Sequence, residues 1–206
     1  MLPMFPLGTV LLPGGVLPLH VFEPRYRQLV IDCLADDTGE PEFGVTMIER
    51  GSEVGGGDQR SNVGVIARMV QVQALDDGRY ALLAVGTRRF RVLAWLPDDP
   101  YPLADVDEWP DRDADAPELP SRVADLTSRL ADVLALAAQL GEVPADVDLD
   151  AVSDDPLVAS YHLAALSPIG PADRYRLLCA DNPAERLDLL AECLDDVEAM
   201  LRFRLT

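Results

Sequence analysis

The chain has 206 residues, 49% of them hydrophobic, and a formal net charge of −19 at pH 7. This length accommodates one medium-sized domain or two small ones, and the apolar content excludes a chain that is disordered throughout. The acidic balance disfavours binding to nucleic acid and to anionic membrane surfaces, because both carry negative charge themselves. We therefore expect a globular protein that binds neither nucleic acid nor membrane.

The basic residues exclude several classes of enzyme site. All seventeen are arginine and none is lysine. The sequence therefore contains no phosphate-loop lysine, no Schiff-base lysine and no Ser–Lys dyad. The three cysteines, Cys33, Cys179 and Cys193, form no CxxC pair. Their number and spacing predict buried free thiols and a reducing, cytoplasmic location.

The first 22 residues carry no charge and raise the question of a targeting segment. No basic n-region precedes the apolar run, which argues against a signal peptide. Four prolines interrupt it, which argues against a membrane helix. The pattern instead predicts short strands near 4–6, 8–12 and 16–22 around a Pro-Gly-Gly turn. Apolar residues occur on both alternating faces of 16–22, so we expect this strand to be buried on both sides.

A helix is predicted immediately after this strand, with Glu23 as N-cap and Pro24 at the first helical position. Apolar residues recur there at helical spacing as far as Leu34. A short strand is expected at 43–48. Residues 49–62 contain almost nothing to bury and predict a long loop, either functional or mobile.

The clearest β element is a long hairpin with strands at 63–75 and 79–96. Asp77-Gly78 is a strong two-residue turn signal between them. Within the first strand, the apolar positions change from odd to even numbers, which predicts a β-bulge or a barrel corner. A further strand is expected near 103–109.

The remaining sequence is predicted to be helical. Residues 111–120 are acidic and proline-containing and are interpreted as a linker. Helices are then expected from 123 to Gly141, at 156–166, at 171–180 and from 183 to the end. The domain organisation is therefore a β-rich part at 1–110 with one helix, the linker, and a helical part at 121–206. This is an α+β protein.

Catalytic and metal-binding motifs are not found. His20 and His162 have no second ligand at metal-binding spacing. No serine lies in a GxSxG elbow. The sequence therefore predicts no catalytic residue, no metal and no cofactor. A small hydrolase whose site only the fold assembles remains an alternative.

One dense basic cluster contains Arg88, Arg89 and Arg91, with Phe90 between them. It is either a docking site for carboxylates of an acidic partner or a solvated strand face paired with the chain's own acids. The turn formed by Glu23, Arg25 and Tyr26 has the same two interpretations: a helix start held by ionic contacts, or a partner contact.

Motifs distributed along nearly the whole chain resemble the Lon protease N-terminal (substrate-binding) domain family. They are PLGTVLLPGGVLPLHVFEPRYRQLV near the start, the strands VGVIARM and GTRRFRVL, and the segments DPLVASYHLAALSP and DNPAERLDLLAECLDDVEAML of the tail. The chain is particularly similar to bacterial stand-alone members, which lack the ATPase and protease modules.

This resemblance implies a PUA-like β pseudo-barrel followed by a C-terminal helical bundle. It also implies a non-catalytic module that holds unfolded polypeptide or docks a partner protein. An adaptor or regulator of a separate ATP-dependent protease is a further alternative. The expected contact surface lies near Phe22 and Tyr26 and acts by strand addition or through an apolar groove. The candidate binding residues are Phe22, Glu23, Arg25, Tyr26, Arg88, Arg89, Phe90 and Arg91. The oligomeric state is not predicted.

Overall fold

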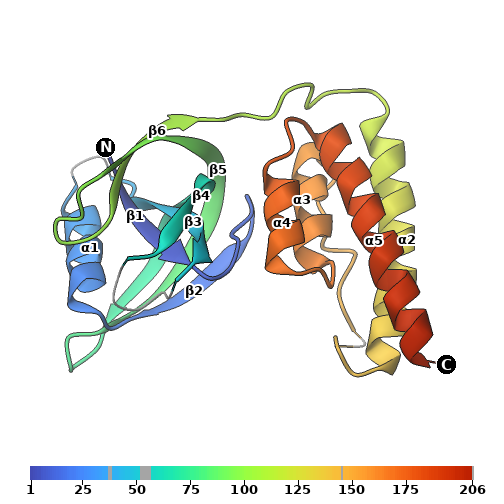
Figure 1. Ribbon diagram of the computed structural model, residues 1–206, viewed down its shortest axis with the longest axis horizontal. Helices are drawn as coiled ribbons and strands as arrows, with labels where there is room; N and C mark the ends of the chain where they lie inside the picture. The colour runs from blue at the N-terminus through green and yellow to red at the C-terminus, as the bar shows by residue number, and fades with distance from the viewer. Residues whose placement is uncertain (37–38, 52–56, 145, 206) are drawn as a thin grey trace. The chain divides into compact units, whose positions relative to one another are not determined.

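The computed structural model describes the chain of 206 residues except for residues 37–38, 52–56, 145 and 206. It contains two compact units, Met1–Pro110 and Asp111–Thr206 (Figure 1). The first is built mainly of strands and the second of helices, so the predicted α+β class is confirmed. No helix in the described residues has both the length and the apolar character needed to cross a bilayer.

The first unit is a closed ring of five strands with a sixth strand attached. The strands are β1 (Leu2–Leu7), β2 (Val16–Val21), β3 (Glu42–Arg50), β4 (Gln59–Ala74), β5 (Tyr80–Leu96) and β6 (Leu103–Glu108). The order β1-β3-β4-β5-β6 closes because β6 pairs with both β5 and β1. Strand β2 pairs with the first half of β5 and lies outside the ring. This arrangement confirms the predicted pseudo-barrel.

Two apolar layers stabilise this unit. Met4, Ile66, Phe90 and Ala104 fill the interior of the ring. Outside the ring, helix α1 (Pro24–Ala35) buries the stripe that begins at Tyr26. The predicted stripe ends earlier than expected, because Leu34 is exposed.

A tight turn carries the chain into β2. The Gly15 N–H donates to the Leu12 carbonyl over 2.9 Å, and Gly14 has a φ of 79°. A proline followed by a residue with positive φ is the signature of a type II turn, and Pro13-Gly14 supplies both. The strand predicted at 8–12 does not form: its apolar residues are buried, but they belong to the connection between β1 and β2.

Strand β2 corrects a second expectation. Its inward residues Leu17 and Val21 are buried, whereas Val16 is 62% exposed and Phe22, just beyond the strand, is 52% exposed. The predicted burial on both faces is therefore wrong. The physical reason is topological: β2 is attached outside the ring, so the rest of the unit covers only one of its faces.

The hairpins also differ in detail from the sequence pattern. Strands β3 and β4 extend into the loop predicted at 49–62, to Arg50 and from Gln59. Residues 52–56 of that loop lie outside the described residues. Between β4 and β5, the register shifts at Val65/Ala67 and at Met69/Gln71. The predicted bulge is thus confirmed.

The second unit is a bundle of four helices. They are α2 (Leu119–Gln139), α3 (Pro156–Leu166), α4 (Pro171–Leu178) and α5 (Pro183–Leu205). Helix α2 packs against α5 and α3, and α4 packs against α5. Gly141, with a φ of 72°, follows the end of α2 as predicted. Asn182 accepts from the Glu185 N–H over 2.8 Å and starts α5.

A buried charged group organises this bundle. The Arg186 side chain is fully buried and its guanidinium donates to Asp111, to the Ser160 hydroxyl and to the Tyr161 hydroxyl. The Tyr161 hydroxyl in turn donates to Asp111 over 2.6 Å. The Arg112 N–H donates to the Asp181 carbonyl. The first residues of the predicted linker 111–120 are therefore held by the helical unit.

Candidate functional site

A small apolar pocket lies where β1, β2 and the start of α1 meet; we call it the β1–β2 pocket. Its volume is about 90 Å³. Phe5 and Leu7 come from β1, residues 19–22 from β2 and its end, and Glu23 and Tyr26 from the start of α1. The topology explains the hollow, because β1 and β2 are consecutive along the chain and yet do not pair with each other.

The floor of the pocket is aromatic. The Phe5 and Tyr26 rings stack with centroids 4.0 Å apart and an interplanar angle of 14°. The Arg25 guanidinium lies over the Tyr26 ring, 4.5 Å from its centroid. Burial raises the pKa of Tyr26 to about 12, so this hydroxyl stays neutral at physiological pH.

The rim of the pocket continues into an exposed apolar surface. Val16, Pro18, His20 and Phe22 alternate along β2 and are all exposed; we call this surface the outer face of β2. The His20 and Phe22 rings lie 6.5 Å apart on it. Alternation on a pleated strand places these four side chains on one side and the buried Leu17 and Val21 on the other.

A network of ion pairs borders the pocket on the α1 side. Arg25 donates to Glu23 over 3.1 Å. Arg60 pairs with Asp58 at 2.7 Å and with Asp98 at 3.0 Å. Burial opposes ionisation of Asp58, but the hydrogen bonds to this carboxyl and the charges of Arg60 and Arg25 together outweigh it, so its pKa is lowered. Three carboxylates thus face two guanidinium groups here, leaving one negative charge in excess.

The basic cluster at 88–91 is used within the unit. Arg88 binds Glu42 through two nitrogens, at 3.0 and 2.9 Å, and binds Glu108 at 2.7 Å. These contacts raise the pKa of Arg88, the bond to Glu42 most of all. Of the two interpretations of the basic cluster, Arg88 therefore fits the strand face that is paired with the chain's own acids.

Its neighbours are held by Trp109. The guanidinium carbons of Arg89 and Arg91 lie 4.3 and 3.5 Å from the centroid of its ring. Arg89 is buried and Phe90 is fully buried in the ring interior. In this conformation neither Arg89 nor Phe90 offers a surface to a partner, which corrects their place among the candidate contacts.

The structure therefore brings together only half of the predicted site. Phe22, Glu23 and Tyr26 line the β1–β2 pocket. Arg25 lies over the Tyr26 ring but is not among the lining residues. None of the described lining residues comes from 88–91. Leu19 and His20 were missed. The apolar residues on both faces of 16–22 are the signal that could have identified them, had the strand been recognised as lying outside the ring.

The described lining of the pocket contains few side chains that could take part in catalysis. His20 and Glu23 line it, but its described lining contains no serine or cysteine, and Glu23 already accepts from Arg25. The other histidine, His162, accepts from the Ser153 N–H over 3.2 Å and holds a turn. Among the described residues, no group of three or more acidic, His or Cys side chains could hold a metal ion.

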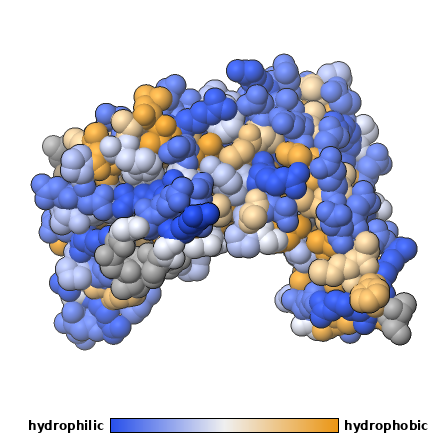
Figure 2. Space-filling view, viewed as in Figure 1, coloured by the Kyte–Doolittle hydropathy of each residue, from blue (hydrophilic) through white to orange (hydrophobic). Residues whose placement is uncertain are grey.

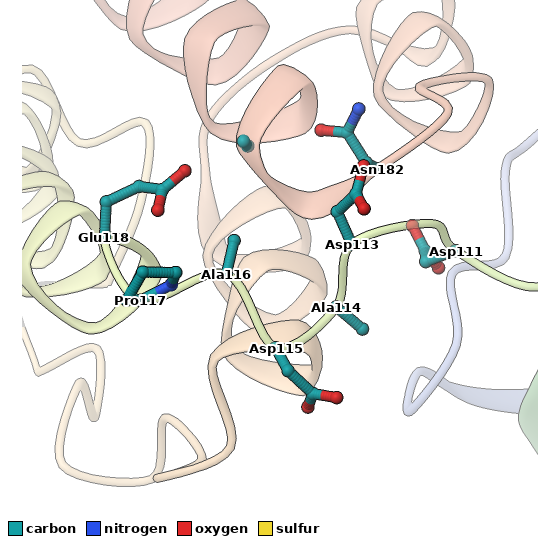
Figure 3. Close-up of a pocket in the computed structure, with 9 residues that line it drawn as sticks. Asp111, Asp113, Ala114, Asp115, Ala116, Pro117, Glu118 and Asn182 are labelled. Atoms are coloured by element: carbon teal, nitrogen blue, oxygen red, sulfur yellow. The ribbon is translucent and has the colours of Figure 1, made fainter.

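A second, larger hollow of about 830 Å³ lies beside the segment that leads into α2. Its described lining consists of Asp111, residues 113–118, Asn182 and Ala184. Figure 3 shows that its carboxylates project in different directions and do not converge on one point. It is an open, acidic depression without the apolar walls of a ligand pocket.

The sequence matches a family model along most of its length. Residues 1–196 match the family described as the ATP-dependent protease La (LON) substrate-binding domain. Lon protease 2 of Sorangium cellulosum is 30% identical over 91% of this chain and 24% of its own length. The Lon protease of Anaeromyxobacter dehalogenans is 34% identical over 54% of this chain and 13% of its own length. The chain thus corresponds to a quarter or less of these relatives.

Two solved structures have the same fold. The Lon N-terminal domain protein from Xanthomonas campestris is 30% identical, with a TM-score of 0.68, over 93% of this chain and 96% of that one. The N-terminal domain of Mycobacterium avium complex Lon protease is 23% identical, with a TM-score of 0.66, over 95% of this chain and 98% of that one, and shows the fold alone. The chain belongs to the family of Lon protease substrate-binding domains.

Proposed function

We propose that this chain is a non-catalytic module that binds segments of unfolded polypeptide at the β1–β2 pocket and the outer face of β2. The observation that carries the proposal is the pair formed by this face and this pocket. A strand with apolar residues on both faces has only one of them covered, and the uncovered face leads into an apolar hollow. Exposed apolar surface of this kind marks a site of interaction.

The surroundings support a polypeptide ligand. Over the face viewed in Figure 2, hydrophilic residues predominate and hydrophobic residues form small separate patches. The net charge of −19 opposes binding to nucleic acid. The family match adds that related domains are described as substrate-binding. The cysteines Cys33, Cys179 and Cys193 are free, which fits a reducing cytoplasm as the place of this activity.

Fluorescence anisotropy with a labelled, permanently unfolded model protein tests the proposal. We expect saturable binding to the wild-type chain and weaker binding to Phe22→Ala. Phe203→Ala is the matched control, because Phe203 is 81% exposed and lies on α5 in the other unit. The same loss in both variants, or no binding by the wild type, would contradict the proposal. Binding to one folded protein alone would favour the partner-docking alternative.

A further inference from the structure

The two strands that contribute to the β1–β2 pocket both contain prolines, Pro6 in β1 and Pro18 in β2. The Met4 N–H donates to the Pro102 carbonyl over 2.8 Å, so the Met4 backbone faces away from β3. Backbone direction alternates along a strand, so Pro6 faces away from β3 as well. Pro6 has no N–H and is buried, so an added strand finds no open edge at this position of β1.

Strand β2 lies at the end of the described strand order and pairs with β5, so its other edge is open. The Gly14 N–H donates to the Gly86 carbonyl, and the Gly86 N–H donates to the Gly15 carbonyl. From that bonded position the antiparallel register continues through Val16↔Val85 and Pro18↔Leu83. Because bonded and non-bonded pairs alternate, Val16, Pro18 and His20 direct their backbone groups away from β5. Pro18 thus removes the central donor of the open edge.

A strand that added to the open edge of β2 would therefore lose a ladder hydrogen bond. Prolines at such positions are a known protection against edge-to-edge pairing. The β1–β2 pocket remains open to a side chain of a bound polypeptide. Its volume of about 90 Å³ is below the roughly 150 Å³ of a dry cavity that holds benzene. A branched aliphatic side chain suits it better than an aromatic ring.

Charge selects the residues that flank this side chain. The ion pairs beside Tyr26 leave one carboxylate in excess. The turn between β4 and β5, which adjoins the end of β2 through Val21↔Tyr80, carries Asp76 and Asp77, and Arg79 pairs with Asp77. A segment with acidic flanks is repelled chiefly by the net charge of −19 of the chain, whereas basic flanks are attracted.

We infer that the β1–β2 pocket takes a single branched aliphatic side chain of an extended, basic polypeptide segment, while Pro18 keeps the backbone of that segment from pairing with the open edge of β2. This inference rests on the proposed function and specifies its ligand. Of the two modes expected from the sequence, it selects the apolar groove over strand addition.

A set of labelled peptides with the full chain tests the inference by anisotropy. The parent probe is unstructured, with one central leucine and two lysines on each side. We expect changing leucine to alanine to weaken binding about 10-fold, and tryptophan to bind more weakly than leucine. Glutamates in place of the lysines should weaken binding about 10-fold at low salt, and less as salt rises. N-methylation of alternate backbone nitrogens should change affinity less than twofold, because no ladder forms.

The outcomes separate this inference from the proposed function. Failure to bind the unfolded model protein contradicts the function itself. If that protein binds but the peptide series shows no dependence on the central side chain, or binds better with glutamates, the inference is wrong. Loss of binding on N-methylation would show strand addition instead. Concentration-dependent dimerisation that competes with the peptide would assign the pocket to a second copy. Phe22→Ala should reduce parent-peptide affinity and Phe203→Ala should leave it unchanged.

Discussion

Asp111 and Arg186 are 75 residues apart in sequence, and a carboxylate oxygen of the first lies 2.5 Å from a guanidinium nitrogen of the second. The Arg186 guanidinium also lies 3.8 Å from the Tyr161 ring centroid. Ser160 and Tyr161 satisfy its other donors, and Leu177 accepts from its Nε. A buried charge held by this many partners specifies how α3, α4 and α5 meet the first residues of the unit.

Replacing this arginine should strongly destabilise the helical unit. Arg186→Met leaves the Asp111 carboxylate buried without its counter-charge, which costs about 3–5 kcal/mol. Urea unfolding followed by far-UV circular dichroism measures the change. Arg202→Met is the matched control, because Arg202 pairs with Glu198 on the surface of the same helix, where such a pair contributes about 0.5 kcal/mol or less. Equal effects would show that the buried network adds no stability.

Alkaline pH should destabilise the β-rich unit through Tyr26. Burial raises the pKa of Tyr26 to about 12, against roughly 10 in an unfolded chain. Because its pKa is higher in the folded state than in the unfolded chain, neutral Tyr26 contributes to the free energy of unfolding. This contribution is complete below pH 10 and is lost between pH 10 and 12. The loss should be on the order of 2–3 kcal/mol. Urea midpoints at pH 9 and pH 12 test this, and Tyr26→Phe should reduce the difference between them. An undiminished difference in Tyr26→Phe would assign the effect to other groups.

The open edge of β2 should pair with other copies of the chain when Pro18 is replaced. Pro18→Val restores an N–H at the centre of an exposed strand edge, and such edges pair with other chains. Sedimentation velocity should show concentration-dependent association of Pro18→Val and none of the wild type. Pro117→Val, at an exposed position outside any strand, is the control. A monomeric Pro18→Val would show that the proline does not protect the edge.

Gly86 lies so close to the turn before β2 that any side chain at this position should destabilise the protein. A Cβ at Gly86 would lie 2.4 Å from the Leu12 carbonyl oxygen and 3.0 Å from Val65. Since the oxygen belongs to the backbone, Gly86→Ala requires the turn to shift and should cost about 1–3 kcal/mol. Gly170→Ala, where a Cβ would meet nothing within 4 Å, should change the unfolding free energy by less than about 1 kcal/mol. Thermal denaturation of both variants provides the comparison.

Local sequence patterns predicted most of the fold. Asp155, Asn182 and Gly141 lie at helix ends because capping depends on neighbouring residues alone. The bulge in β4 was visible as a change of alternation, which is also local. The strand expected at 8–12 failed because apolar residues can be buried in a connection without pairing. Its alternation could not indicate that Pro13-Gly14 turns the chain into β2 before a partner strand is reached.

For the candidate site too, local sequence patterns predicted some features, and others depend on the tertiary structure. The sequence by itself determined that the protein has no lysine chemistry, that it is α+β, and that residues 22–26 join a strand to a helix. Only the tertiary structure decided that Phe22 is exposed while Phe90 is buried, although both are aromatic residues at apolar positions of a strand pattern. Exposure depends on which elements cover a residue, and that is settled by strand order: β5 contributes to the closed ring, whereas β2 is attached outside it and keeps one apolar face uncovered.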